Sequence, residues 1–333
     1  MISSIFYEEE IVDHPRTKFI FSKFKKARKI SINRYTEIFN KRDQNFKIQK
    51  SYPSLILAKK HSGHVLSAPE GFGIGNSKNY YFSHMYNCLY DCRYCFLQGM
   101  YSSANYVLFV NYEDFEQQIS QIIDKNKNKE MTFFSGYDCD SLALENITGF
   151  ASYFLEKFQN HPNALIELRT KSIQVEPLNS IEPINNCVVA YSLLPEIISK
   201  DLDKKTPSIE RRIEAMKKLA LKGWRIGLRF DPLIHGKDWK KLYKELHLKV
   251  FESLPSESIH SISYGPLRFP KAMFKNIFKL YPKEKLFAGP LVQNSGEFKY
   301  NDKIEKEMLE FCQNISKKYI PKSILFNCSP ILS

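Results

Sequence analysis

Three closely spaced cysteines are the part of this sequence best suited to chemistry. Cys88 and Cys92 are separated by three residues, and Cys92 and Cys95 by two. Cysteine thiolates are the usual ligands of iron–sulfur clusters, and soft sulfur selects such clusters or zinc. Three thiolates leave one iron of a four-iron cluster without a protein ligand, so that a small molecule can bind and react there. The spacing therefore predicts a reactive [4Fe–4S] cluster.

Zinc is the alternative occupant of this site. Zinc sites usually have four ligands, often arranged as two close pairs, whereas here the next cysteine after the triplet is Cys139. His84, four residues before Cys88, is the residue that would complete a zinc site. The spacing and the aromatic Phe96 after the third cysteine favour the cluster.

Length and composition are those of a globular protein. The 333 residues, of which 43% are hydrophobic and 14% aromatic, suffice for one large barrel or two smaller domains. No apolar run approaches the roughly 18 residues that span a bilayer, and the acidic N-terminus does not resemble a signal peptide. The seven cysteines are an odd number and suit a reducing compartment. We expect a cytoplasmic protein without a membrane partner.

Positive charge is concentrated near the N-terminus. The whole chain carries a net charge of +13, and residues 16 to 50 hold twelve Lys or Arg residues against two acidic ones, a net charge of +10. Aromatic residues are interleaved with these cations. This combination suits a polyanion, because phosphate contacts dominate affinity for nucleic acid. The alternative is a solvated basic face in a lysine-rich protein.

Strand and helix patterns alternate along most of the chain. One amphipathic stretch begins after Asn111, a suitable N-cap, and another runs from Pro207, at the first helical position, to Gly223 as C-cap. The glycine-rich run 67–76 is predicted as a loop at the approach to the site. Such alternation indicates a parallel sheet with crossover helices, and ligands then collect at the carboxyl ends of its strands. The apolar runs predicted as strands are 106–110, 131–134, 164–168, 187–191, 224–230 and 259–264.

Several segments beyond the cysteines resemble the spore photoproduct lyase family of radical S-adenosylmethionine (SAM) enzymes. The resemblance extends from about residue 55 to 330. It implies an α/β fold with a partial (β/α)6-type radical SAM barrel, a basic N-terminal extension and a C-terminal α/β region. We accordingly divide the chain into residues 1–55, 56–270 and 271–333. The matching segments are 95–98, 109–114, 140–149, 168–172, 191–193, 206–215 and 227–235.

The resemblance also implies an activity. Members of the family use a 5′-deoxyadenosyl radical to repair a thymine dimer in DNA, and take electrons from an external one-electron reductant of the flavodoxin or ferredoxin type. Abstraction of hydrogen at C6 of the dimer triggers scission of its methylene bridge, and a hydrogen must then be returned. Extruding a base from the DNA stack costs a few kcal/mol, and the cost is lower for a damaged base. DNA is therefore the expected partner.

Individual positions take their predicted roles from the resemblance. Cys88, Cys92 and Cys95 would bind the [4Fe–4S] cluster. The remaining positions would bind SAM: Tyr94 lies against its nucleoside, Ser135 and Gly136 hold its amino group, Lys171 reaches its carboxylate or ribose, and Ser192 reaches its ribose.

The chain departs from the family pattern where hydrogen is returned. The family uses a cysteine and two tyrosines there. Tyr94 matches the first tyrosine, but Phe96 replaces the second and has no O–H group. The donor cysteine position falls at Tyr137, and Cys139 follows two residues later, so either is a candidate donor.

Two residues in the C-terminal third are also predicted to contact DNA. Lys299 and Tyr300 fall where the family places a DNA-binding hairpin, and lysine can contact phosphate while tyrosine stacks on bases. Cys187, Cys312 and Cys328 are interpreted as core residues because they lie in apolar runs.

Two alternatives to lesion repair remain: the same scaffold acting on another nucleic-acid or small-molecule substrate, and a DNA-binding protein whose metal centre is structural.

Overall fold

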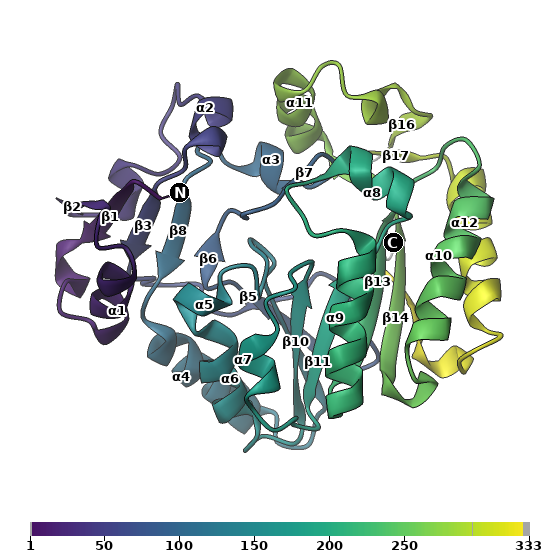
Figure 1. Cartoon of the computed structure of the whole chain (residues 1–333), viewed down its shortest axis with the longest axis horizontal. Helices are drawn as coiled ribbons and strands as arrows, with labels where there is room; N and C mark the ends of the chain where they lie inside the picture. Colours follow the sequence, from purple (N-terminus) through teal and green to yellow (C-terminus); the bar gives the residue numbers. More distant parts are fainter. Residues whose placement is uncertain (1, 295, 329–333) are drawn as a thin grey trace.

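The computed structural model describes residues 2–294 and 296–328. Figure 1 shows a small N-terminal sheet at one end of the long axis and a large curved sheet in the middle. Helices α10 (Trp239–Ser253) and α12 (Asp302–Ser316) pack at the other end. Among the described residues, no helix is both long and apolar enough to cross a bilayer.

The large sheet forms the predicted partial barrel. Its order is β18-β14-β13-β11-β10-β9-β5-β4, and all neighbours are parallel except the short antiparallel pair β4–β5. Five predicted apolar runs lie in it, but the run 106–110 does not, and the first barrel strand, β5, was not predicted. The strands are β4 (Leu66–Ser67), β5 (Lys78–Phe82), β9 (Met131–Ser135), β10 (Ala164–Thr170), β11 (Cys187–Ser192), β13 (Arg225–Leu233), β14 (Ile259–Pro266) and β18 (Leu325–Asn327).

Helices cover the outer face of this sheet because their apolar sides meet its strands (Figure 1). Phe154, for example, packs its ring 5.2 Å from that of Phe82. Such buried aromatic side chains contribute strongly to core stability. Besides α10 and α12, these helices are α4 (Tyr112–Lys125), α6 (Phe150–Phe158), α7 (Glu176–Asn179) and α9 (Ile209–Lys222). The short helix α5 (Glu145–Thr148) packs against α1 (Pro15–Lys23), and α8 (Glu196–Leu202) packs against β12 (Asp203–Lys204).

Two predicted helix starts differ in detail. Asn111 precedes α4, yet its side chain does not cap the helix: its oxygen accepts from the Lys60 N–H at 2.9 Å and its amide donates to the Lys60 carbonyl at 2.8 Å. Pro207 lies outside α9, because the Ser208 hydroxyl accepts from the Arg211 N–H and makes Ser208 the N-cap. Gly223 ends α9 with a φ of +106°, as predicted.

The N-terminal residues form a sheet of their own. Its order is β2-β1-β3-β8-β6, so strand 106–109 pairs with β3 rather than with the barrel. Residues 1–55, predicted as a separate segment, thus share a sheet with later strands, and residue 55 is no boundary in it. The elements are β1 (Ser4–Glu8), α1 (Pro15–Lys23), β2 (Arg28–Ile32), α2 (Phe46–Ser51), β3 (Leu55–Ala58), β6 (Met85–Tyr86) and β8 (Tyr106–Phe109).

The C-terminal region closes one side of the barrel mouth. Helix α11 (Lys271–Leu280) packs on the short helix α3 (Leu97–Met100), and the Asn276 amide donates to the Gly99 carbonyl at 2.9 Å. A Cβ at Gly99 would lie 2.5 Å from the Met273 carbonyl oxygen, so this contact requires glycine. A three-stranded sheet follows, formed by β15 (Arg268–Pro270), β16 (Leu291–Asn294) and β17 (Glu297–Tyr300).

The remaining elements are short. Strands β7 (Asp91–Cys92) and β12 (Asp203–Lys204) pair antiparallel across the barrel mouth. Single turns of 3-10 helix are found at Glu9–Ile11, Tyr35–Glu37, Ser256–Ser258, Lys285–Ala288 and Lys322–Ile324.

Candidate active site

A cavity of about 560 Å³ opens at the carboxyl ends of the barrel strands. Parallel strands deliver their following loops to one edge of the sheet, which is why residues far apart in sequence meet here. The glycine-rich loop, through Phe72 and Gly73, forms part of the wall, as predicted. All positions predicted for the cluster, SAM and hydrogen return line it: Cys88, Cys92, Cys95, Tyr94, Ser135, Gly136, Lys171, Ser192, Tyr137 and Cys139.

The cysteine loop is anchored from the N-terminal sheet. Asn87 has a φ of +68°, and its amide donates to the carbonyls of Ser103 and Asn105 at 2.8 and 2.7 Å. The ammonium of Lys50, which is only 6% exposed, donates to the carbonyls of Cys88 and Tyr90 at 2.7 and 2.9 Å. Lys50 was predicted only as one of many basic residues, since nothing in its local sequence distinguishes it.

The same loop is anchored to the barrel through Asp203. Backbone pairing of β7 with β12 places Asp203 opposite Cys92, and the Tyr94 hydroxyl donates to the Asp203 carboxylate. Arg212 binds that carboxylate at 2.9 Å, and both side chains are fully buried. Arg212 also donates to the Ser192 carbonyl at 3.0 Å. The cysteine loop and the end of β11 are therefore held by one network.

The charges of this network are balanced. Burial alone would raise the pKa of Asp203, but Lys171 and Arg212 hold it below its ordinary value. Burial would likewise lower the pKa of Lys171, but Cys92 and Asp203 raise it above its ordinary value. The ammonium of Lys171 lies 5.4 Å from the centre of the Tyr94 ring. A charged lysine thus faces the space between the cysteines and the ends of the strands.

The cysteine sulfurs are spaced too widely for one zinc ion. Tetrahedral zinc with a Zn–S bond of about 2.3 Å holds its sulfurs about 3.8 Å apart. In the part of the chain that the structure describes, the three sulfurs do not all lie within 4.8 Å of one another. His84, the ligand that zinc would need, stacks on Phe150 at 3.9 Å and does not line the cavity. These positions disfavour zinc and suit a larger cluster.

The electrostatics of the three thiols also suit a cationic metal centre. All three are free cysteines. Burial raises the pKa of Cys88 to about 12 and raises the pKa of Cys92 and Cys95 as well, while Lys50 and Lys171 act in the opposite direction. Metal ions displace protons from thiols on binding. A bound metal would ionise these sulfurs, and the two lysines would stabilise the resulting negative charge.

The ends of β9 and β10 are fixed by Asp140. Its carboxylate accepts from the Thr170 hydroxyl and from the Lys171 N–H, both at 2.7 Å. Ser135 donates to the Glu167 carbonyl at 2.8 Å. Gly136 has a φ of +76°, and a Cβ there would lie 2.6 Å from the Ser141 hydroxyl. Asp140 was part of a matching segment but was not predicted as a site residue.

The predicted hydrogen-return residues lie on the loop that follows β9, directly after Ser135 and Gly136. The ring of Tyr137, which is 46% exposed, lies 5.3 Å from that of Phe96 and 4.6 Å from that of Tyr81. Cys139 is 8% exposed, with its sulfur 3.9 Å from Nδ1 of His84. Both candidate donors therefore reach the cavity, Tyr137 with an exposed ring and Cys139 with a buried sulfur.

One of the three cysteines predicted in the core also reaches the cavity. Cys328 is buried, as predicted, but it lines the cavity as well, and its sulfur accepts from Arg268 at 3.7 Å. Arg268 also pairs with Asp231 at 3.6 Å. Sequence reasoning missed this charged wall, because its members come from three separate segments. Cys187 and Cys312 are fully buried in the core, as predicted.

Lys299 and Tyr300 are positioned differently from the predicted DNA contacts. The hairpin β16–β17 exists, but Tyr300 is 2% exposed, and its hydroxyl accepts from the His235 N–H at 3.0 Å. The Lys299 ammonium pairs with Asp302 and Glu305, both at 3.2 Å. These partners inside the protein leave neither side chain available to DNA in this conformation.

The family model and the curated relatives that match this chain carry the same description. The family model described as spore photoproduct lyase matches residues 1–325. Spore photoproduct lyases of Clostridium acetobutylicum and Bacillus subtilis are each 25% identical to the chain, over 227 and 202 residues. These alignments cover 67% and 60% of this chain and 66% and 59% of the relatives. The chain thus spans somewhat less than two thirds of the length of the two curated relatives.

Solved structures share the fold over nearly the whole chain. A spore photoproduct lyase mutant with bound AdoMet and dinucleoside spore photoproduct superposes with a TM-score of 0.84 at 17% identity. A spore photoproduct lyase complexed with dinucleoside spore photoproduct gives a TM-score of 0.82, also at 17% identity. Each match covers 99% of this chain and 98% of the other. The partial barrel predicted from the sequence is therefore confirmed.

Proposed function

Because the chain belongs to the spore photoproduct lyase family, we propose that it is a radical SAM lyase that repairs the spore-type thymine dimer in DNA. The observation that carries this proposal is the cavity at the barrel mouth. It is lined by three free cysteines and by the strand-end residues Ser135, Lys171 and Ser192. A structural metal centre alone would not need polar groups converging on it from three other strands.

Residues of this chain would bind both cofactors, the [4Fe–4S] cluster and SAM. Cys88, Cys92 and Cys95 hold the [4Fe–4S] cluster, and Lys171, Ser135 and the peptide at Gly136 take the polar groups of SAM. When bound and reduced by one electron, the cluster and SAM supply a 5′-deoxyadenosyl radical. Tyr94 is held by Asp203, so its ring forms a fixed wall for the nucleoside.

The product radical must receive a hydrogen atom from a residue that lines the cavity. Phe96 cannot donate one. Burial raises the pKa of both Tyr137 and Cys139, so each keeps its hydrogen at neutral pH. Tyr137 is the more exposed of the two, whereas Cys139 is buried with its sulfur beside His84. We propose these two residues as the hydrogen donors to be tested. Donation leaves a tyrosyl or thiyl radical, which one electron from the external reductant and one proton from solvent return to the O–H or S–H form.

DNA is the proposed macromolecular partner. Five cations near the N-terminus have exposed side chains and belong to α1, β2 or the turn between them: Lys23, Lys25, Lys26, Arg28 and Lys29. Other basic residues of this segment are used within the protein, as Arg16 is in its pair with Glu113 at 2.8 Å. Exposed clustered cations suit contacts with phosphates. We also propose a cytoplasmic location and a flavodoxin- or ferredoxin-type reductant.

Anaerobic turnover tests the proposed function. The reconstituted protein is incubated with SAM, dithionite and dinucleoside spore photoproduct, and 5′-deoxyadenosine and thymine products are measured by chromatography. We expect both to appear. SAM cleavage without restored thymine would instead support the same scaffold acting on another substrate, and no SAM cleavage at all would support a structural metal centre.

A further inference from the structure

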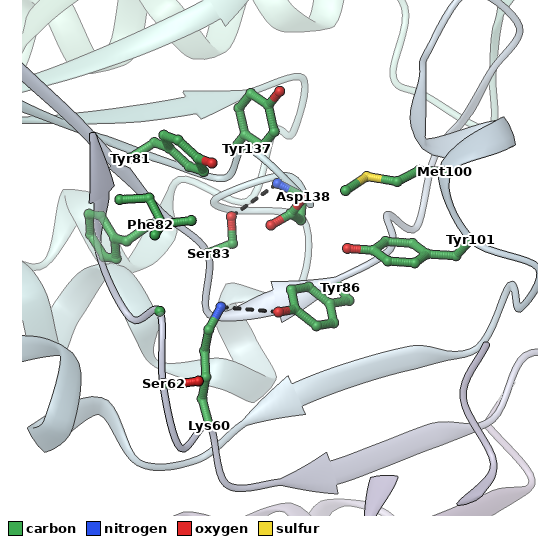
Figure 2. Close-up of a pocket in the computed structure, with 12 residues that line it drawn as sticks. Lys60, Ser62, Tyr81, Phe82, Ser83, Tyr86, Met100, Tyr101, Tyr137 and Asp138 are labelled. Carbon is green, nitrogen blue, oxygen red and sulfur yellow. Dashed lines mark hydrogen bonds between the residues drawn. The ribbon is translucent and has the colours of Figure 1, made fainter. Parts of the chain in front are cut away.

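A second pocket, of about 240 Å³, lies beside the active cavity. Tyr81 and Tyr137 line both spaces, so the two are neighbours across these rings. Figure 2 shows side chains from several parts of the fold around the pocket. Lys60 and Tyr86 come from the N-terminal sheet and its connections, Asp138 follows β9, and the remaining wall includes the segment after α3. Apart from Tyr137, the residues that line this pocket have no part in the proposed reaction.

The walls of this pocket are aromatic. The rings of Tyr86 and Tyr101 have centroids 5.5 Å apart at an angle of 32°, and those of Tyr81 and Tyr137 are 4.6 Å apart at 36°. In Figure 2, Tyr81 and Tyr137 lie above Asp138, and Tyr86 and Tyr101 lie below it and to the right. Tyrosine rings are the usual stacking surface for nucleobases in proteins that bind single strands.

The charged groups that line the pocket are one cation, Lys60, and one carboxylate, Asp138. Lys60 donates to the Tyr86 hydroxyl at 3.2 Å, and the Asp138 N–H donates to the Ser83 hydroxyl at 3.0 Å (Figure 2). Asp138 is 7% exposed. Within residues 2–294 and 296–328, neither Lys60 nor Asp138 has an ion-pair partner within 4.0 Å. A phosphate would be repelled by the carboxylate, whereas an uncharged ring with both donors and acceptors suits the pair.

We propose that this pocket binds the nucleobase next to the lesion in the same DNA strand. The inference rests on the proposed function, because the active cavity must hold the dimer for its neighbour to reach Tyr81 and Tyr137. A carbonyl oxygen of the base accepts from Lys60, and a ring or amino N–H donates to Asp138. Guanine and thymine offer these two groups on adjacent atoms, and adenine has no carbonyl. The pocket thus favours guanine or thymine beside the lesion.

The size of the pocket agrees with a single base. Its volume is less than half that of the active cavity, 240 against 560 Å³. It is also below the roughly 300 Å³ at which sites for drug-sized ligands begin. One ring system fits, and a dinucleotide does not.

Equilibrium binding to short oligonucleotides tests the proposal. The probes are dinucleoside spore photoproduct and trinucleotides that extend it on the 5′ or the 3′ side by guanosine, thymidine, adenosine or an abasic sugar. On either the 5′ or the 3′ side of the lesion, we expect an added guanine or thymine to tighten binding roughly tenfold relative to dinucleoside spore photoproduct, as a stacked base does. Adenine should tighten binding by a smaller factor, and the abasic sugar should not tighten it at all.

Two variants assign the effect to the pocket. Tyr101→Ala removes a stacking ring, and Asp138→Asn removes the carboxylate with almost no change of shape. Both should lose most of the gain from the added base while retaining the affinity for dinucleoside spore photoproduct. Tyr319→Ala, a control on a tyrosine that stacks on Phe251 away from the pocket, should keep the gain.

The outcomes separate this proposal from the proposed function. An equal gain from the abasic extension, or a gain that survives in both variants, would overturn the base pocket while leaving repair intact. If the protein neither binds nor cleaves dinucleoside spore photoproduct, the proposed function fails and the pocket proposal fails with it.

Discussion

The two sides of the active cavity are built differently. On the cofactor side, the cysteine loop is held by Lys50, by the pairing of β7 with β12 and by the Asp203–Arg212 ion pair. On the hydrogen-return side, Tyr137 is 46% exposed and contacts Phe96 and Tyr81 only through rings. A buried polar network depends on every member, because an unpaired partner is costly. Ring packing tolerates replacement more easily.

The chain departs from its family at a residue that directly follows the third cysteine and packs against Tyr137. Every position predicted for the cluster and SAM is present at the cavity, whereas the second relay tyrosine is replaced by Phe96. We expect single substitutions of Tyr137 or Phe96 to leave the protein folded. Substitutions in the Asp203–Arg212 network should destabilise it, since these buried residues bind one another.

The largest expected effect is on the cofactor side. Cys92→Ala removes one of three iron ligands, and we expect loss of the four-iron content and of all SAM cleavage. Iron analysis and the visible absorbance of the reconstituted protein measure this. The control Cys187→Ala, in the core on β11, should retain iron. A full cluster in Cys92→Ala would show that the triplet is not the ligand set.

Breaking the buried ion pair should destabilise the same side. Arg212→Met leaves the Asp203 carboxylate buried without its guanidinium, which typically costs about 3–5 kcal/mol. Denaturant unfolding measures this loss, and cluster retention should fall with it. Arg211→Met, on the exposed side of the same helix, is the matched control. Equal stability of the two variants would remove the Asp203 network from the explanation.

Substitution of the candidate donors should leave SAM cleavage intact and change the products. If Tyr137 returns the hydrogen, Tyr137→Phe gives abortive products at the expense of thymine, and Cys139→Ala does not. If Cys139 returns it, the pattern is reversed. Chromatography of the products distinguishes the two. Normal thymine yield from both variants would rule out both donors.

The smallest expected effect concerns pH. Burial lowers the pKa of His84 to about 3, whereas an unfolded histidine titrates near 6.5. Between these values the unfolded chain binds more protons, so stability falls as the pH falls below about 6.5. The loss for this residue should be about 1.4 kcal/mol at pH 5.5. His84→Phe should flatten the pH dependence of unfolding, and His161→Gln should not.

The barrel strands and the cofactor residues were predictable because their signals are local or carried by family segments. The run 187–191 is β11 almost to the residue, and the cysteine spacing is read directly. The N-terminal sheet was missed because β1, β2 and β3 are separated by helices and turns, and their pairing with β8 depends on contacts distant in sequence.

The remaining site residues were not predictable for a similar reason. Lys50 looks like any lysine of a basic segment, and only the fold brings it to the Cys88 carbonyl. Lys299 and Tyr300 have the residue types of a DNA contact, but burial and pairing with Asp302 and Glu305 depend on how α12 packs on the hairpin. Residue type alone does not show which way a strand faces.

The most direct test is repair carried out in D2O. The reconstituted protein, with SAM and dithionite, is given dinucleoside spore photoproduct, and the thymine product is analysed by mass spectrometry. Both Tyr137 O–H and Cys139 S–H exchange with solvent, so we expect restored thymine that carries deuterium. SAM cleavage without thymine, or thymine free of deuterium, would contradict repair with hydrogen return from this side of the cavity.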